Sequence, residues 1–115
     1  VTVGEKQPIA YGNASGDKNP IHMDDATAKA AGHPGIILHG LCTLALSTRA
    51  VVQRSAKGDW SKLKSIRCRF SKIARPGERL RIIAYRNFDG AIDFETYNMS
   101  GNTVITSGSA TFHAN

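Results

Sequence analysis

The stretch from Gly40 to Arg54, GLCTLALSTRAVVQR, is the one run in this chain with sustained helical periodicity, and it decides the fold class. Its apolar residues are Leu41, Leu44, Ala45, Val51 and Val52 on one face, widened by Cys42, Leu46 and Ala50. A helix that is apolar nearly all round is a buried helix. We therefore predict one long central helix, with Arg49, Gln53 and Arg54 on its wet side and at its end.

Strands are predicted throughout the rest of the chain after this helix. Apolar Ile66, Cys68 and Phe70 alternate with polar neighbours, which is typical of a strand. Further strands are predicted for residues 80–85, 92–97 and 104–112, and turns at Asp89-Gly90 and Gly101-Asn102. One long helix against an antiparallel sheet is an α+β layer arrangement. Such a sheet has open edges, which predicts pairing into a dimer.

Short elements are expected before the helix. Residues 1–3 alternate weakly and predict a strand, and Pro8 begins a helical turn that reaches Ala14. A short helix is predicted over residues 26–31, with Asp24 or Asp25 as its N-cap and Gly32 at its C-terminal end.

Length and composition predict one domain over residues 1–115. Cys42 and Cys68 show no CxxC spacing and lie in apolar patterns, which favours two buried thiols, a reducing compartment and a cytoplasmic location. No signal peptide or C-terminal address is visible. No apolar run approaches the ~20 residues that cross a membrane, so we expect no membrane partner.

The net charge of +6 is high for 115 residues and fits nucleic acid, a membrane surface or an anionic small molecule. Basic side chains crowd one strand and the start of the next: Lys62, Lys64, Arg67, Arg69, Lys72, Arg75, Arg79 and Arg81. A surface for nucleic acid would interleave aromatic residues with these charges, but Phe70 has the opposite parity to Arg67 and Arg69. We therefore expect no nucleic-acid partner.

Asp17 and His22 lie five positions apart across the turn residues Gly16, Asn19 and Pro20. A carboxylate and an imidazole that touch one water molecule form a general acid/base pair. The alternative is a loop aspartate that accepts backbone N–H groups beside a histidine that only packs. Spacing by itself leaves both interpretations open.

His39-Gly40 precedes the long helix. The backbone N–H of Gly40 would be unpaired at the positive end of the helix dipole, where it suits the oxygen of a carbonyl group. A glycine also permits close approach, because it has no Cβ. The alternative is a simple helix start. For His39 we expect a packed, structural role rather than a catalytic one.

An acid/base pair with a carbonyl-polarising N–H suits addition or elimination of water next to an activated carbonyl. Other arrangements fit less well. Ser15, Asp17 and His22 lie too close in one turn to form the relay of a hydrolase. His22, His33 and the aspartates 24 and 25 match no known metal-ligand spacing, so no metal is expected.

The segments ASGDKNPIHMD, from Ala14, and GIILHGLCTLAL, from Gly35, resemble the MaoC-like (R)-specific enoyl-CoA hydratase family, the hydratase 2 group. The likeness spans residues 11 to about 52, and the later strands, with the FSKIARPGERL stretch, agree in order. It implies a hot-dog fold, a long helix wrapped by an antiparallel sheet, paired as a dimer or present twice in one chain. It implies reversible hydration of a trans-2-enoyl-CoA to a (3R)-hydroxyacyl-CoA, with coenzyme A as part of the substrate and no other cofactor.

The resemblance also implies roles for individual residues. Asp17 and His22 match the catalytic pair that holds the attacking water, with Asp17 expected to take a water proton and His22 to help deliver one to the α-carbon. Gly40 matches the residue whose N–H binds the thioester carbonyl, and Asn19 a position that shapes the catalytic loop and so the substrate site. Lys72 and Arg75 are candidates for phosphate contact, by charge only.

Two features depart from short members of this family. The N-terminus is short for a stand-alone member, and HPGIILHGLCTLALSTRAV is more similar to the catalytic half of double hot-dog members. This chain would then need a second copy or a partner chain. Two other functions stay open on this fold, an acyl-CoA thioesterase and a non-catalytic module that binds acyl-CoA.

Overall fold

The computed structural model describes residues 1–114. Its helices are α1 (Gln7–Ser15), α2 (Asp25–Ala30) and α3 (Gly40–Ser55), with short 3₁₀ turns at Pro20–His22 and Trp60–Lys62. Its strands are β1 (Leu63–Phe70), β2 (Arg81–Arg86), β3 (Ile92–Tyr97) and β4 (Thr103–Phe112). The predicted long helix and all four predicted strands after it are confirmed, within one to three residues at their ends.

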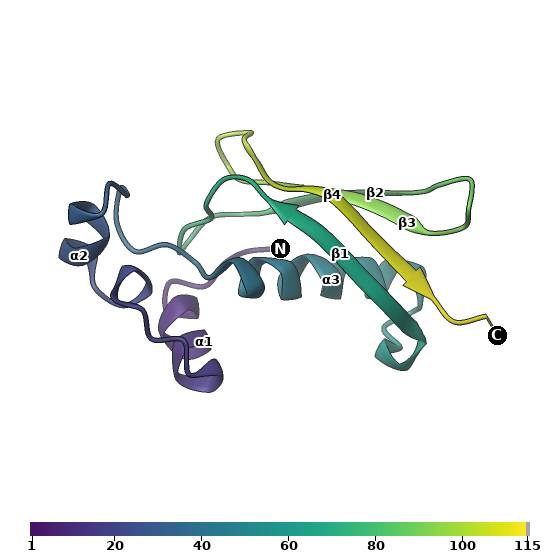
Figure 1. The fold of residues 1–115 in the computed structure, drawn as a ribbon, viewed down its shortest axis with the longest axis horizontal. Helices are drawn as coiled ribbons and strands as arrows, with labels where there is room; N and C mark the ends of the chain where they lie inside the picture. Colours follow the sequence, from purple (N-terminus) through teal and green to yellow (C-terminus); the bar gives the residue numbers. More distant parts are fainter. Residues whose placement is uncertain (115) are drawn as a thin grey trace.

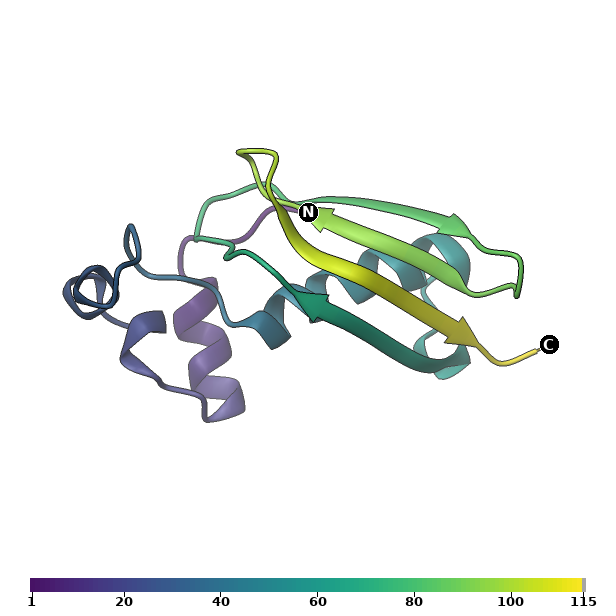
Figure 2. The ribbon, with the colours of Figure 1, turned by 45° about the horizontal axis from the view of Figure 1, so that its top comes forward.

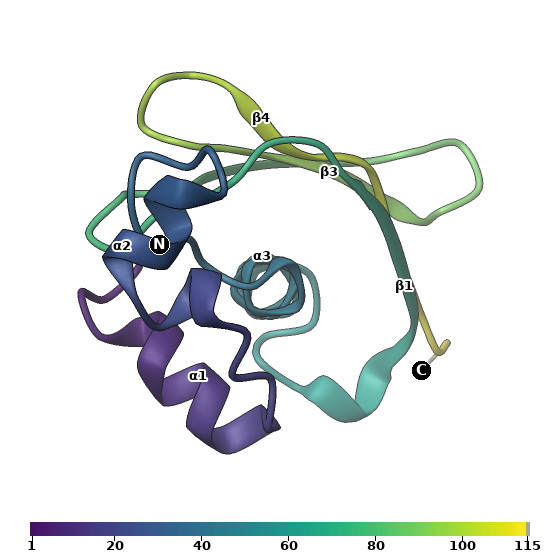
Figure 3. The same cartoon turned by 60° about the vertical axis from the view of Figure 1, so that its left-hand side comes forward.

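The four strands form one antiparallel sheet in the order β1-β4-β3-β2, so β1 and β2 are its two edges. Helix α3 runs along one face of this sheet (Figures 1 and 2). Seen along the axis of α3, the sheet curls around the helix, while α1 and α2 lie on the side that the sheet leaves open (Figure 3). The predicted α+β arrangement of a helix wrapped by an antiparallel sheet is confirmed.

Two clusters of buried side chains hold α3 in place. Near its N-terminal half, Cys42 and Leu46 pack with residues of the loops, and near its C-terminal half Val51 packs with strand residues. The strand residues are Ile92, Phe94, Ile105 and Ala110. No helix among the described residues has the length and apolarity that crossing a membrane requires.

The predicted buried face of α3 was partly wrong. Leu41 is 64% exposed and Ala45 is also exposed, whereas three hydroxyl side chains face inward: Thr43, Ser47 and Thr48. Each of the three donates to the carbonyl four residues earlier, at 3.3, 2.9 and 2.7 Å. Because their hydroxyls are satisfied by their own helix, these small side chains can pack close to the sheet at little cost.

Ser47 and Thr96 form a buried hydrogen bond of 2.8 Å between α3 and β3, and both side chains are fully buried. We expect Ser47→Ala to lower the free energy of unfolding by about 1–3 kcal/mol, because it leaves the Thr96 hydroxyl without this partner. Urea unfolding measures this loss. The matched control is Ser55→Ala, at the exposed end of the same helix. A Ser47→Ala, Thr96→Val double variant should lose less than the sum of its two single changes, and full additivity would contradict the coupling.

The predictions before α3 need correction. Residues 1–3 are not a strand: Thr2 forms only an isolated bridge with Arg79, although Val3 is fully buried. Helix α1 is longer than the predicted turn, and α2 begins and ends one residue earlier than predicted. Asp24 is the N-cap of α2, and the hydroxyl and backbone N–H of Thr27, at 2.6 and 3.0 Å, hold the pKa of its carboxyl below the usual value.

Candidate active site

Asp17 lies in the loop that follows α1. Helix α1 ends at Ser15, and its C-cap is Gly16, whose φ of +84° is a left-handed conformation that glycine adopts without strain. The chain then turns back, and the backbone N–H of Asp17 donates to the Ser15 hydroxyl at 3.1 Å. A Cβ on Gly12 would lie only 3.0 Å from the carbonyl oxygen of Asp17, so α1 packs closely against this loop. Asp17 itself is exposed.

His22 is the last residue of the 3₁₀ turn at Pro20–His22, whose start is capped by the Asn19 side chain, which accepts from the backbone N–H of Ile21 at 3.3 Å. Only 8% of His22 is exposed. Its Nδ1 lies 2.8 Å from the carbonyl oxygen of Ile37. A carbonyl can only accept, so Nδ1 carries the proton and, in the neutral ring, Nε2 is bare.

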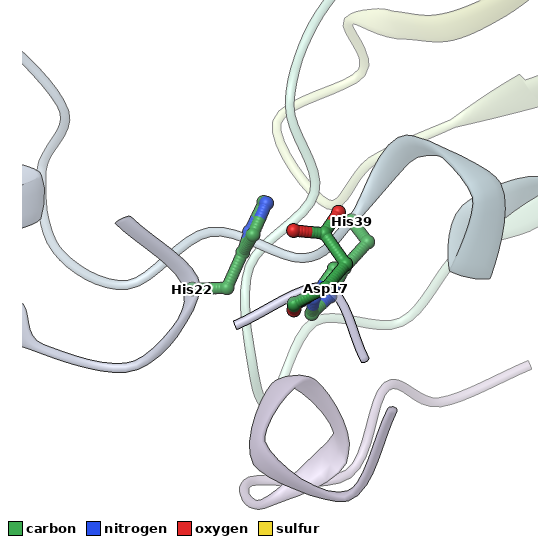
Figure 4. Close-up of side chains that lie close together, drawn as sticks. All are labelled: Asp17, His22 and His39. Carbon is green, nitrogen blue, oxygen red and sulfur yellow. Dashed lines mark hydrogen bonds between the residues drawn. The ribbon is translucent and has the colours of Figure 1, made fainter. Parts of the chain in front are cut away.

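His39 brings these two residues together with the start of α3. Its Nε2 donates to the carbonyl oxygen of Asp17 at 2.8 Å, and its ring stacks on His22 with centroids 3.7 Å apart and planes 20° apart. Asp17, His22 and His39 each place a carboxylate oxygen or ring nitrogen within 4.8 Å of the others. Figure 4 shows the carboxylate of Asp17 turned toward the ring of His22. Asp17 and His22 thus lie close together, as the family resemblance implied, whereas the contacts of His39 with both go beyond the packing role predicted for it.

Gly40 is the first residue of α3, and no side chain within residues 1–114 caps the start of that helix. Its backbone N–H therefore lies at the positive end of a 16-residue helix, directly after His39. A Cβ on Gly40 would lie 3.3–3.5 Å from three carbon atoms of the Phe70 ring. Phe70, at the end of β1, thus fills the space into which any larger side chain at position 40 would extend.

The stacked histidines are poorly arranged to share a metal ion. An imidazole binds a metal in the plane of its ring, at about 2.0–2.1 Å in zinc sites. With the two rings nearly parallel and 3.7 Å apart, an ion between them would lie far out of both ring planes. The geometry therefore favours proton chemistry over metal binding at this cluster.

The three residues expected to bind substrate lie in different settings. Asn19 is exposed, and its carbonyl caps the turn that carries His22. Lys72 is exposed in the loop between β1 and β2. Arg75 is half-buried in the same loop: its guanidinium lies against Gly35, and its Nε has no hydrogen-bond partner within residues 1–114.

The MaoC like domain family matches residues 1–108 of this chain. A relative from Dictyostelium discoideum named "Probable enoyl-CoA hydratase 2" is 38% identical over 107 residues, which are 92% of this chain and 36% of the relative. The peroxisomal multifunctional enzyme type 2 from Drosophila melanogaster is similar in structure, with a TM-score of 0.91 and 37% identity over 98% of this chain and 21% of that protein. The chain thus spans about a third and a fifth of their lengths.

The (R)-hydratase from A. caviae has the same fold, with a TM-score of 0.79 at 20% identity, and the match covers 96% of this chain and 86% of that protein. Together with the long helix wrapped by an antiparallel sheet, this likeness confirms the hot-dog fold. The match over residues 1–108 and the identity of 38% establish the family. The chain belongs to the MaoC-like domain family.

Proposed function

We propose that this chain is a hydro-lyase that adds water reversibly to trans-2-enoyl-CoA to give (3R)-hydroxyacyl-CoA. The observation that carries the proposal is the placement of the Asp17 carboxylate and the His22 ring within 4.8 Å of each other, next to the start of α3. Support also comes from relatives whose names include enoyl-CoA hydratase 2. No observation favours a thioesterase or a non-catalytic module over this activity.

The tautomer of His22 changes which residue takes the proton of the attacking water: it is His22 in this proposal, and not Asp17 as expected from the resemblance. Because Nδ1 carries a proton for the Ile37 carbonyl, the bare Nε2 of neutral His22 has none to deliver. We therefore assign Asp17 and His22 as two acceptors for one water molecule, whose lone pairs remain free to attack the β-carbon. As the new C–O bond forms, one water proton passes to Nε2. The imidazolium returns that proton to the α-carbon, and the charge of Asp17 stabilises the imidazolium meanwhile.

The electron pair of the carbon–carbon double bond moves onto the thioester oxygen during this attack. The N–H of Gly40, at the helix N-terminus, is positioned in this proposal to stabilise that oxygen as the enolate forms. Protonation at the α-carbon restores the carbonyl. The substrate gains the elements of one water molecule and the enzyme is unchanged, so we propose that no cofactor beyond the coenzyme A of the substrate is needed.

The net charge of +6 suits a substrate that carries several phosphates. Lys72, which is exposed, is the better of the two candidates for phosphate contact, because the Arg75 guanidinium packs against Gly35. We propose a cytoplasmic location for this chain; several of its relatives are named as peroxisomal enzymes. Cys42 is buried as predicted, whereas Cys68 is only half-buried; both thiols are free, which suits a reducing compartment, and desolvation raises the pKa of both.

We propose that residues 1–115 form one hot-dog unit that pairs with a second copy or with another hot-dog half. Strands β1 and β2 are open edges, and Leu41 and Phe70 expose 64% and 48% of their surfaces beside the site. A partner that covers these apolar side chains would also shield Asp17 from bulk water. Sedimentation equilibrium measures the pairing, and a monomer at all concentrations would contradict self-association.

The activity is tested by following the absorbance of the conjugated enoyl thioester with crotonyl-CoA and a longer enoyl-CoA, and by determining the configuration of the product. Loss of absorbance with a (3R)-hydroxy product supports the proposal. Release of free coenzyme A, detected with a thiol reagent, would support a thioesterase instead. Acyl-CoA binding with neither reaction would support the non-catalytic module.

Gly40→Val should lower kcat/KM at least about tenfold, because the new side chain extends into the Phe70 ring and displaces the thioester oxygen from the helix N-terminus. Gly40→Ala should cost less, since its Cβ meets Phe70 at 3.3 Å and the ring can shift slightly. The control is the Gly40→Val, Phe70→Ala double variant, which should recover part of the loss. Unchanged kinetics in Gly40→Val would contradict the role of this N–H.

A further inference from the structure

His39 contacts or adjoins all three residues of the proposed site: Asp17, His22 and Gly40. It is 2% exposed and precedes Gly40 as the N-cap residue of α3. Its backbone carbonyl accepts from the N–H and hydroxyl of Thr43 at 3.0 and 3.3 Å, which ties it to the first turn of the helix. The position of His39 is therefore set by α3 and not by the loop that carries Asp17.

The two polar edges of the His39 ring differ. Nε2 donates to the carbonyl oxygen of Asp17, 22 residues earlier in the chain, so in the neutral ring Nδ1 is bare. That Nδ1 is buried and has no hydrogen-bond partner within residues 1–114. A buried acceptor without a partner costs free energy. An aromatic or aliphatic side chain could fill the same space without this cost in free energy, so packing by itself does not explain a histidine at position 39.

The two faces of the ring have separate contacts. His22 stacks on it with centroids 3.7 Å apart, and Tyr11 from α1 leans on it with centroids 4.7 Å apart and planes at 52°. The ring plane of His22 is thus determined by two contacts, the stack on His39 and the bond from Nδ1 to Ile37. Together they hold the His22 ring beside the carboxylate of Asp17 (Figure 4).

We infer that His39 is a positioning residue for the hydration reaction: its Nε2–H holds the Asp17 loop, its ring orients His22, and its backbone places Gly40. It does not touch the substrate or exchange a proton. This inference rests on the proposed function. Misplacing a reacting group by about 1 Å can lower the rate by about 10²-fold. Removing the contacts of His39 should therefore lower kcat.

Two variants separate the two contacts. His39→Phe keeps a ring for the stack but removes the donor to Asp17, and His39→Gln keeps a donor near the position of Nε2 but removes the ring. We expect each to lower kcat by about tenfold or more while KM stays within about threefold. His113→Gln, at an exposed histidine in the C-terminal segment, is the matched control and should leave both constants unchanged.

Nitrogen-15 NMR of the imidazoles provides a readout that does not depend on turnover. In the wild-type protein, His39 should be protonated at Nε2 and His22 at Nδ1, and the opposite tautomer of His39 would overturn the inference. In His39→Phe and His39→Gln, the ring signals of His22 should shift. If both variants retain kcat within about twofold, or lose only thermal stability with an unchanged kcat, His39 is merely structural. If the wild type shows no hydration, the proposed function fails, whereas the His22 signals still decide the positioning role.

Discussion

Asp17→Asn is expected to lower kcat by about 10²–10⁴-fold while the fold stays intact, because the change is nearly isosteric but removes the negative charge that orients the water and stabilises the His22 imidazolium. The loop itself should tolerate the change. Asp17 forms three hydrogen bonds: its backbone N–H donates to Ser15, its backbone carbonyl accepts from His39, and one side-chain oxygen accepts from the N–H of Asn19. Asparagine has the same backbone groups and a side-chain oxygen, so it can form all three. The measurement is the loss of enoyl-thioester absorbance under substrate saturation.

The matched control for this prediction is Asp89→Asn, at an exposed aspartate in the turn between β2 and β3. It makes the same chemical change away from the site and should leave kcat unaltered. Circular dichroism and thermal unfolding of both variants show whether the fold is retained. If Asp17→Asn keeps its activity within about threefold of the wild type, the assignment of Asp17 as part of the acid/base pair is refuted.

His22→Ala should cost a similar factor of about 10²–10⁴ in kcat, because it removes the nitrogen that accepts the water proton and returns it to the α-carbon. It should also lower stability by about 1–3 kcal/mol, because the buried carbonyl of Ile37 loses its donor. Steady-state kinetics and urea unfolding of the same preparation measure the two effects.

A second variant at this position separates the two effects. The amide nitrogen of Asn in His22→Asn lies near the position of Nδ1 and can donate to Ile37, but the residue has no counterpart of Nε2. It should therefore be as inactive as His22→Ala and more stable. An active His22→Asn would show that the Ile37 contact, and not proton transfer, is the contribution of His22. His113→Ala serves as the exposed control.

The sequence determined most of the fold because its signals are local. Apolar residues at helical spacing from Gly40 predicted α3, and alternation with glycine turns predicted all four strands. The turn residues around Asp17 and His22 likewise predicted a loop that reverses the chain, and the 3₁₀ turn at Pro20–His22 with its Asn19 cap confirms it. The strand predicted from the weak alternation over residues 1–3 was wrong: these residues exchange backbone hydrogen bonds with residues 77–80, before β2 begins, and form a single isolated bridge there.

Only the tertiary structure decided which side of α3 is buried and what His39 does. Three hydroxyl side chains face inward and donate to carbonyls of their own helix: Thr43, Ser47 and Thr48. Burying them therefore costs less free energy than their hydropathy indicates. His39 contacts Asp17 across 22 residues and His22 across 17, and no local backbone preference specifies either contact. They arise because Tyr11 of α1 and the backbone carbonyl of Asp17 meet His39 at the N-terminal end of α3, on the side that the sheet leaves open. Residue types and spacing predicted the acid/base pair, but the relative position of its two members is a property of that packing.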